Sequence, residues 1–453
     1  MKKYQKIAQQ MEQQILEHHY QQGEKLPSIQ FLAKQHQCSK ATIIKCYEIL
    51  VNKHLIYVKP QSGYYVADGL LKISSDHDRF ALNTGNPIVS ATSLIDAKHC
   101  LSIAIEQYSE SSLNISLQGV SSLREILPSF LSNMGIYGKE DSIYLIQGVT
   151  QMLSFLSSLE FQNHHQYILI EEPTYSYYVQ FLQSMHFPVL TIQRDESGID
   201  LKELQRLFNK YDIKFFYTVP RNHNPLGTTL NTYTRQRIAE LALKYDVYII
   251  EDDYFGHCSY SPRYMPISYY MEGQNCIYLT SFSKTIPYIR IGVCVIHPHF
   301  KETFETLIHQ SYYYSYQLPS LISQATLESY LRSSLYQKQI QGLQEQLNKD
   351  YQIIKQITKD WNPLIAKPIY DQSGYYMSMK IHPSIQLDIL QTNLLHHHIK
   401  IARNERCFYN PEHFNHTIRL SLARIHPDDL SNALNIFYQT ILEYTVQNKI
   451  NIL

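Results

Sequence analysis

The segment CIYLTSFSKTIPYIRIGVCVIHP, residues 276–298, contains two apolar runs, CIYLT and IGVCVI, on either side of a polar stretch. Apolar runs of this length, rich in β-branched and aromatic residues, predict buried strands. Lys284 follows the first run and is flanked by Ser281, Ser283 and Arg290. A lysine at a strand end beside hydroxyl groups and an arginine suits an imine-forming amine next to a phosphate site. Taken alone, these residues also fit a surface lysine near an arginine.

Further apolar runs of the same kind precede this segment: SIYLIQG, QYILIEEP, KFFYTVP and VYIIEDDYF. They alternate with helix-like stretches such as TYTRQRIAELALKY. This alternation predicts an α/β fold in which helices cover both faces of a largely parallel, doubly wound sheet. From about residue 330 the chain changes to a long polar helix and a smaller α+β unit that contains GYYMSMKI and HTIRLSLAR. We therefore predict a large domain at residues 81–330 and a small domain at residues 331–453.

The N-terminal part of the chain follows a different pattern. Apolar residues spaced at i, i+4, i+8 and i+9 predict an amphipathic helix that runs until Gly23. Ser28 and Ser39 are suited to cap two further short helices, and LIYVKPQSGYYVA predicts a hairpin. Three helices and a hairpin form a winged helix-turn-helix, which we place at residues 1–68. The polar stretch at residues 69–80 is the expected linker.

The composition excludes several classes of protein. Lys plus Arg and Asp plus Glu both total 40 among 453 residues, so no overall charge points to a nucleic acid or a membrane as partner. Residues 1–68, however, hold nine lysines, five acidic residues and no arginine. Without an apolar run of roughly 18 to 20 residues or a signal-peptide pattern, a soluble cytoplasmic protein is expected. Seven scattered cysteines without a CxxC pair argue against a disulfide framework and a Cys-based zinc site, and we expect no bound metal.

Other strand ends carry polar residues that would be unusual in a plain core. Asp252 ends one buried run, and Asn224 lies in the turn VPRNHNPLG. A buried carboxylate can keep a pyridinium nitrogen protonated and an amide can donate to a phenolate oxygen, which are the edge contacts of pyridoxal phosphate. Gly148 precedes a helix start whose N–H groups could hold a phosphate, and Tyr175 offers a ring to stack on a flat heterocycle. Each has a simpler explanation as a turn, a cap or a core aromatic, but their joint occurrence in this order favours a pyridoxal phosphate site.

Residues 80–450 resemble a fold-type I aminotransferase of the aspartate aminotransferase superfamily, and residues 1–68 resemble a GntR-type winged helix. In this order in one chain, the two regions resemble the MocR subfamily of GntR transcription regulators. The resemblance rests on motifs that cover nearly the whole chain: YQKIAQQM, LPS, SKATIIKCYEIL, SGYYV, NHNPLG, EDDYF, SFSK, RIG and IRLSLA.

The resemblance implies roles for individual residues in binding pyridoxal 5'-phosphate. Lys284 would form the internal aldimine, and Asp252 would pair with the pyridine nitrogen. Arg419, in IRLSLA, would bind the α-carboxylate of an amino-acid ligand, a task that suits a guanidinium. The remaining expected cofactor contacts are the phenolic-oxygen partners Asn224 and Tyr254, the stacking ring of Tyr175, and the phosphate ligands Ser281, Ser283, Arg290 and the backbone of Val149 and Thr150.

On this basis the expected function is that of a pyridoxal-phosphate-dependent, DNA-binding transcription regulator. The winged helix would bind operator DNA, and the aminotransferase-like domain would sense pyridoxal phosphate, an amino-acid-like ligand or both. The resemblance also implies a head-to-tail homodimer that contacts paired half-sites. The expected DNA contacts lie at the starts of the second and third helices and in the wing, at Ser28, Ser39, Lys40, Thr42, Lys45, Lys59 and Gly63.

Three departures from the family pattern bear on these expectations. Only five residues separate Lys284 from Arg290, one fewer than in common relatives, which alters the loop expected to bring Arg290 to the phosphate. Gln30 replaces the usual arginine after LPS, and Ile44 stands where a basic residue is common. Because lysines replace guanidinium groups on the DNA-binding side, we expect a modest, salt-sensitive affinity for DNA.

Two other functions are open at this stage. The chain could be an active pyridoxal-phosphate-dependent aminotransferase with a residual DNA-binding appendage, since the groups for a first half-reaction are present. Alternatively, the domain could have lost its cofactor and serve only for dimerisation. Ser176, Tyr177 and Tyr178 follow Tyr175, and no arginine there offers a second carboxylate clamp, which disfavours dicarboxylic and ω-amino acids as ligands.

Overall fold

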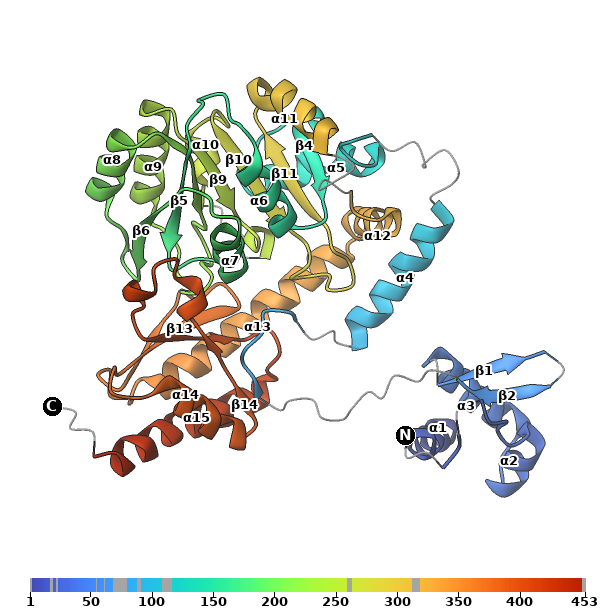
Figure 1. Ribbon diagram of the computed structural model, residues 1–453. Coiled ribbons are helices and arrows are strands. Elements are labelled where there is room, and N and C mark those ends of the chain that lie inside the picture. The colour runs from blue at the N-terminus through green and yellow to red at the C-terminus, as the bar shows by residue number, and fades with distance from the viewer. Residues whose placement is uncertain are drawn as a thin grey trace. The chain divides into compact units, whose positions relative to one another are not determined.

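The computed structural model contains two compact units, residues 1–77 and residues 78–453 (Figure 1). Residues 69–79 of the expected linker lie outside the described part of the chain. The described residues are 2–16, 19–21, 23–53, 55–60, 62–67, 80–87, 91–107, 116–258, 263–311 and 318–449.

The N-terminal unit has three helices and a hairpin, as predicted. Ser28 Oγ accepts a hydrogen bond from Phe31 N, and Ser39 Oγ accepts one from Thr42 N, each at 3.2 Å. These side chains satisfy N–H groups that lack helical partners, which explains where the second and third helices begin. The elements are α1 (Lys3–Leu16), α2 (Ile29–Gln35), α3 (Lys40–Asn52), β1 (Ile56–Lys59) and β2 (Gly63–Val66).

The first helix ends at Leu16, earlier than the predicted limit near Gly23. From Gly23 onward the backbone instead pairs with the hairpin: Gly23 N donates to Val66 O at 3.0 Å, and Leu26 N donates to Tyr64 O at 2.8 Å. This pairing requires extended chain, so the helix has to stop before it. The core enclosed by the helices and the hairpin contains Ile7, Met11, Ile15, Leu32, Ile43, Cys46, Tyr47, Leu50 and Val66.

The larger unit is organised around an eight-stranded sheet with the order β4-β11-β10-β9-β8-β5-β6-β7. Strands β6, β5, β8, β9 and β10 pair in parallel, whereas β11 is antiparallel to both β10 and β4. The predicted largely parallel, doubly wound sheet is therefore confirmed. Its strands are β4 (Ile143–Ile146), β5 (Tyr167–Glu172), β6 (Val189–Asp195), β7 (Gly198–Ile199), β8 (Ile213–Thr218), β9 (Tyr248–Asp252), β10 (Cys276–Ser281) and β11 (Gly292–Ile296).

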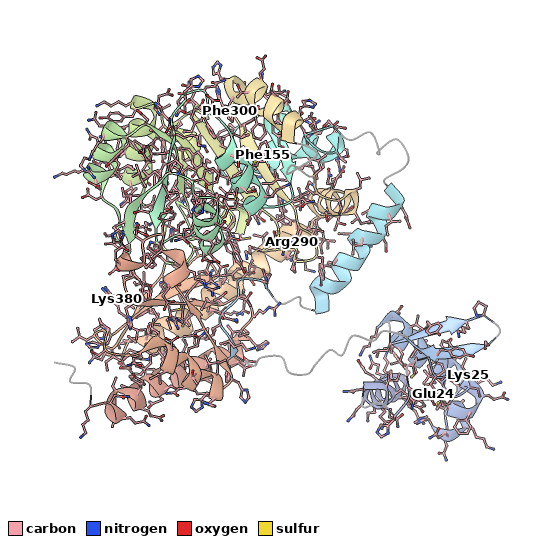
Figure 2. All side chains as sticks on the ribbon, viewed as in Figure 1. Glu24, Lys25, Phe155, Arg290, Phe300 and Lys380 are labelled. Atoms are coloured by element: carbon pink, nitrogen blue, oxygen red, sulfur yellow. The ribbon has the colours of Figure 1, made fainter. Side chains whose placement is uncertain are left out.

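Helices cover both faces of this sheet. Successive strand residues point to opposite faces, and because the residues on both faces are apolar, both faces need a covering layer. Ile168 and Ile170 of β5 belong to the same apolar cluster as Phe155 and Phe300, which are labelled in Figure 2, whereas Leu169 belongs to a cluster with helices of the opposite face. The first face carries α6 (Val149–Ser158), α7 (Ser176–Ser184) and α11 (Pro298–Ser311). The opposite face carries α5 (Ser121–Ser132), α8 (Leu201–Lys210), α9 (Thr232–Lys244), α10 (Ile267–Tyr270) and α12 (Leu321–Arg332), and α4 (Ala91–Gln107) packs on α12.

A smaller antiparallel sheet follows, with the order β12-β13-β16-β15. One continuous apolar core joins residues of this sheet to residues of the large sheet. The elements of this part are α13 (Leu335–Thr358), β12 (Ala366–Ile369), β13 (Tyr376–Ile381), α14 (Leu387–His396), β14 (Ile399–Lys400), β15 (Ala402–Arg403), β16 (Thr417–Ser421) and α15 (Pro427–Gln447). Short 3-10 turns lie at Glu140–Ser142, Gly256–Cys258, Glu405–Cys407 and Pro411–His413, and β3 (Phe80–Ala81) pairs in parallel with β14. Among the described helices, none combines the length and the apolar character needed to cross a membrane.

We expect Gly227→Ala to destabilise the larger unit by about 2 to 4 kcal/mol. Gly227 has a φ of +75°, and a Cβ built there would lie 2.1 Å from the carbonyl oxygen of Tyr376, so both the backbone and β13 would have to shift. The matched control is Gly342→Ala in α13, where an added Cβ meets no described atom within 4 Å and should stabilise the helix by about 0.5 to 1 kcal/mol. Urea unfolding followed by circular dichroism measures both changes, and an unchanged midpoint for Gly227→Ala would contradict this close approach.

Candidate functional site

The polar residues predicted to form a site lie where neighbouring parallel strands end. Strands β10, β9 and β8 are adjacent and parallel, so the segments that follow their carboxyl ends meet at one edge of the sheet. Lys284 follows β10, Asp252 is the last residue of β9, and Asn224 lies in the turn after β8. The topology therefore brings together three residues that lie 28 to 60 positions apart in the sequence.

Lys284 is half-buried, and its Nζ donates a hydrogen bond to the backbone oxygen of Gly85 at 2.9 Å. The buried side chain of Tyr376 also hydrogen-bonds to Lys284. Burial would raise the pKa of Tyr376, but the neighbouring Lys284 ammonium and Arg419 guanidinium outweigh it and lower the pKa below its ordinary value. A Cβ at position 85 would lie 1.8 Å from the Tyr376 hydroxyl oxygen, so only glycine fits beside this tyrosine.

Asp252 is buried and has only one partnered oxygen. Its Oδ2 accepts a hydrogen bond from the Tyr217 hydroxyl at 2.8 Å, while its Oδ1 has no hydrogen-bond partner in the described part of the chain. Burial raises the pKa of Asp252 to about 7, although the hydrogen bond from Tyr217, the backbone N–H of Tyr254 and the charge of Lys284 oppose that shift. An unpartnered carboxylate oxygen in a dry site favours a ligand that brings an N–H or a positive charge. A protonated pyridine nitrogen supplies both.

Arg419 of β16 is oriented by two hydrogen bonds. Its guanidinium donates to Asn224 Oδ1 at 2.8 Å and to Asn83 O at 2.9 Å. The guanidinium also lies over the Tyr376 ring, 4.5 Å from the ring centroid. Its Nε is buried without a partner among the described residues. The guanidinium is therefore held in place with donor capacity left for a carboxylate.

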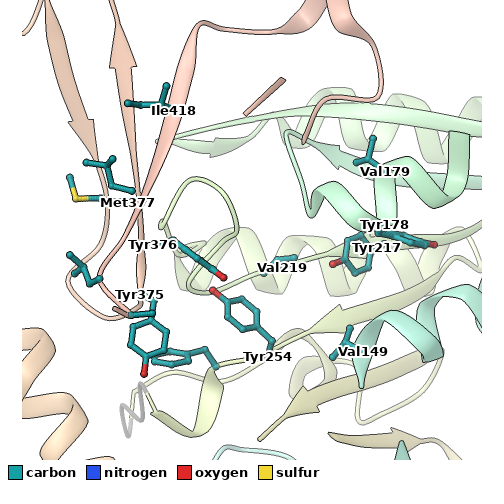
Figure 3. Packing of buried hydrophobic residues seen from close by; sticks show 14 of the residues in the cluster. Val149, Tyr178, Val179, Tyr217, Val219, Tyr254, Tyr375, Tyr376, Met377 and Ile418 are labelled. Carbon is teal, nitrogen blue, oxygen red and sulfur yellow. The ribbon is translucent and has the colours of Figure 1, made fainter. Parts of the chain in front are cut away.

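The hydroxyl of Tyr254 donates to the backbone oxygen of Asn222 at 2.6 Å. Figure 3 shows the hydroxyl groups of Tyr254 and Tyr376 turned toward one another, and their ring centroids are 6.2 Å apart. The Tyr254 proton is thus already engaged by the turn that carries Asn224. The contact predicted for Tyr254 with a phenolic oxygen stays a prediction, and it requires the hydroxyl proton to turn away from Asn222 O.

The turn that carries Asn224 is held by one buried ion pair and by a contact of His223 with a buried carboxylate. Arg221 donates to both carboxylate oxygens of Asp253, and His223 lies 3.3 Å from a carboxylate oxygen of Glu171. Burial alone would raise the pKa of Glu171, but Arg194 and the hydrogen-bonded His223 lower it to about 2. These contacts hold the turn through neighbours of Asn224. The side chain of Asn224 therefore takes no part in them and can contact other residues or a ligand in the site.

The start of α6 lies next to the end of β10. Gly148 has a φ of +151°, and a Cβ built there meets no described atom within 4 Å, so the chain is not closely packed at this glycine. In the sheet, Ser281 is opposite Gly292, which is opposite Ile146 on the strand that leads to Gly148. Free helical N–H groups next to hydroxyls suit a phosphate.

The other residues predicted to bind the ring or the phosphate differ in their hydrogen-bond partners and in their exposure. Ser281 Oγ and Ser283 Oγ are 2.7 Å apart, and the Thr150 and Tyr175 hydroxyls are 3.2 Å apart. Arg290, marked in Figure 2, is exposed just before β11. Val149 and Thr150 are the first two residues of α6, so their N–H groups lack helical partners.

Three residues of the site were not found from the sequence: Tyr217, Tyr376 and Gly85. Tyr217 and Tyr376 lie in the apolar runs KFFYTVP and GYYMSMKI, where a tyrosine fits an ordinary core position. The sequence feature that indicates such residues is a tyrosine within an otherwise apolar run, because a buried tyrosine hydroxyl usually has a hydrogen-bond partner.

The residues predicted to contact DNA lie in the N-terminal unit. The Ser39 and Thr42 hydroxyls are 2.9 Å apart at the exposed start of α3, and Lys40 is exposed beside them. Ser28 caps α2. The Lys45 ammonium is 5.9 Å from the centroid of the Tyr4 ring, the Lys59 ammonium is 4.4 Å from that of the Tyr65 ring, and Gly63 is opposite Lys59 in the hairpin with a φ of +123°.

Comparison with known proteins accounts for both units. Residues 81–437 match the family of class I and II aminotransferases, and residues 3–66 match the gntR family of bacterial regulatory proteins. The uncharacterized HTH-type transcriptional regulator YcxD of Bacillus subtilis is 30% identical over 450 residues, which cover 96% of this chain and 99% of that protein. The HTH-type transcriptional regulator NorG of Staphylococcus aureus is 25% identical over 444 residues, covering 91% and 98% of the two chains.

Solved aminotransferase structures share the fold of the larger unit. LysN, the α-aminoadipate aminotransferase of Thermus thermophilus, superposes with a TM-score of 0.71 at 18% identity over 82% of this chain and 94% of its own. The kynurenine aminotransferase of Pyrococcus horikoshii superposes with a TM-score of 0.72 at 22% identity over 81% and 92%. The fold and the order of the two regions predicted from the sequence are thereby confirmed. The chain belongs to the class I and II aminotransferase family, in the MocR arrangement that joins such a region to an N-terminal gntR-family helix-turn-helix.

Proposed function

We propose that the protein is a pyridoxal-phosphate-dependent transcription regulator of the cytoplasm. Its winged helix binds operator DNA, and its aminotransferase-like unit binds pyridoxal phosphate, an amino-acid-like ligand or both. The observation that supports this best is the buried Asp252, whose unpartnered Oδ1 shares one edge of the sheet with Lys284 and with the start of α6. We further propose a head-to-tail homodimer that contacts paired half-sites, as is usual for regulators that bind palindromic operators.

The chemistry of these residues supports pyridoxal phosphate as the ligand of the site. When bound, the cofactor supplies an aldehyde and an electron-accepting ring. In this proposal Lys284 provides the amine for the aldehyde, and Asp252 Oδ1 accepts the pyridinium N–H. The other proposed contacts are Tyr175 on the ring face, Asn224 and Tyr254 at the phenolic oxygen, and Ser281, Ser283, Arg290 and the N–H groups of Val149 and Thr150 at the phosphate.

The hydrogen bonds of the site suggest how a bound ligand acts on the DNA-binding unit. Three basic residues donate to carbonyl oxygens of the short segment at residues 83–86, which follows the linker in the sequence. The pairs are Lys284 with Gly85, Arg419 with Asn83 and Arg424 with Asn86, each at 2.9 Å. A ligand carboxylate on Arg419, or a cofactor on Lys284, competes with these bonds. We infer that ligand binding weakens these hydrogen bonds to residues 83–86. The change then reaches the DNA-binding unit through the linker that precedes this segment in the sequence.

An active aminotransferase is the second candidate. Lys284, Asp252 and Arg419 are all present at one edge of the sheet, so the groups that hold an amino donor are complete. The gntR-family region favours regulation, because an enzyme of this family needs no helix-turn-helix. Turnover with a keto-acid acceptor in the absence of any DNA binding would favour the enzyme.

Lys284→Ala should abolish the visible absorption band that the purified protein gives with pyridoxal phosphate, since the amine that binds the aldehyde is gone. The control is Lys301→Ala in α11, which removes a lysine that pairs with Asp141 at 3.5 Å. This variant should leave the band unchanged. Circular dichroism verifies that both variants are folded. Retention of the band in Lys284→Ala would refute the lysine assignment, and a wild-type protein without a band would indicate a domain that has lost its cofactor.

Asp252→Asn should flatten the dependence of stability on pH in the protein without added cofactor. Because the folded pKa of Asp252 is raised to about 7 from an unfolded value of about 4, the folded state binds a proton more tightly. Its contribution to the free energy of unfolding is full below about pH 4 and is lost as the pH rises through about 7. Urea unfolding between these values should show a smaller fall in the variant, whereas the exposed control Asp360→Asn should behave as wild type. Identical slopes for Asp252→Asn and wild type would contradict the raised pKa of this buried carboxyl.

Deletion of residues 1–68 should remove DNA binding and leave cofactor binding intact, because the two units have separate cores. A gel shift on the DNA upstream of the protein's own gene, run beside the cofactor titration, measures both properties. The full chain should shift the fragment, and added pyridoxal phosphate should alter the shift. A truncated chain that still shifted the fragment would overturn the assignment of the domains.

A further inference from the structure

The outward face of α3 carries aliphatic side chains between two lysines. Its exposed residues Ala41, Ile44, Lys45 and Glu48 are spaced i, i+3, i+4 and i+7, which places them along one stripe of the helix. Ile44 is 38% exposed. The inward face consists of Ile43, Cys46, Tyr47 and Leu50, which are fully buried and supply the packing that α3 needs. Ala41 and Ile44 are therefore not needed for the core of the unit.

Duplex DNA is the partner whose charge complements this face. In a helix-turn-helix the second helix of the motif enters the major groove, and that helix here is α3. Residues 1–68 carry nine lysines and five acidic residues, a net charge of +4. Lys40 and Lys45, both exposed, flank the aliphatic pair in the sequence and can contact phosphates on its two sides.

The chemistry of the face selects which bases it can recognise. Guanine is usually recognised by an arginine or a lysine; no arginine precedes Arg79, and the two exposed lysines beside the aliphatic pair are assigned to phosphates. The hydroxyls of Ser39 and Thr42 are hydrogen-bonded to each other at the helix cap. Ala41 and Ile44 can neither donate nor accept a hydrogen bond, and the apolar group that the major groove offers is the C5-methyl of thymine.

We propose that Ala41 and Ile44 bind thymine C5-methyl groups in the major groove, so that the operator carries thymines opposite the start of α3. The aliphatic side chains exclude water from the methyl groups, while Lys40 and Lys45 hold the backbone. This inference rests on the proposed function, because it requires α3 to lie in the groove. It also gives Ile44, which departs from the basic residue common at this position, a role in specificity.

The test compares the DNA upstream of the protein's own gene made with thymine and with deoxyuridine. Uracil keeps every hydrogen-bonding atom of thymine and lacks only the C5-methyl group. The full-length protein should bind the uracil fragment at least about fourfold more weakly, the loss expected for one buried methyl group. Ile44→Ala should bind the thymine fragment about fourfold more weakly than wild type and should lose most of the difference between the two fragments.

Lys45→Ala is the matched control on the same stripe. It should weaken binding to both fragments alike and reduce the salt dependence, because a phosphate contact carries no base information. Equal binding of the two fragments by wild type would overturn the inference while leaving the proposed DNA binding intact. Failure of wild type to bind either fragment would instead overturn the proposed function. The uracil comparison uses wild-type protein, so it does not depend on the folding of a variant.

Discussion

The half-partnered carboxylate of Asp252 is the constraint on which the candidate site of the larger unit depends. Burying a carboxylate at the end of a central strand costs free energy unless donors satisfy both oxygens. The Tyr217 hydroxyl satisfies one oxygen, and the other has no partner in the described structure. The elevated pKa of Asp252 expresses that cost. A fold that keeps such a group is suited to a ligand that supplies the missing donor.

The neighbouring structure is rigid enough to maintain this arrangement. The parallel register of β8, β9 and β10 fixes where the three strand ends meet, and apolar helices pack on both faces of the sheet. The ion pair of Arg221 with Asp253 and the contact of His223 with Glu171 hold the turn that carries Asn224. Breaking one partner of such a buried pair is costly, so these interactions specify one geometry even where their net contribution to stability is small.

The two units differ in how they use charge. In the larger unit, the basic residues Lys284, Arg419 and Arg424 are engaged with backbone oxygens of a segment that follows the linker. In the N-terminal unit, Lys40 and Lys45 are exposed on or beside the outward stripe of α3. In the proposed function, the first group of cations exchanges partners when a ligand binds, and the second group contacts the phosphates of DNA.

The sequence by itself determined the order of the elements, the parallel sheet, the caps at Ser28 and Ser39, and the positions of Lys284 and Asp252 at strand ends. These features depend on local spacing and on capping, which act within a few residues. The tertiary structure decided the rest: Tyr217 reaches Asp252 across 35 positions, Lys284 reaches Gly85 across 199, and the chain from Gly23 pairs with β2 where a helix was predicted to continue. A tyrosine in an apolar run has the same local pattern whether it packs in a core or holds a carboxylate. Only the register of the strands and the packing of distant segments distinguish the two.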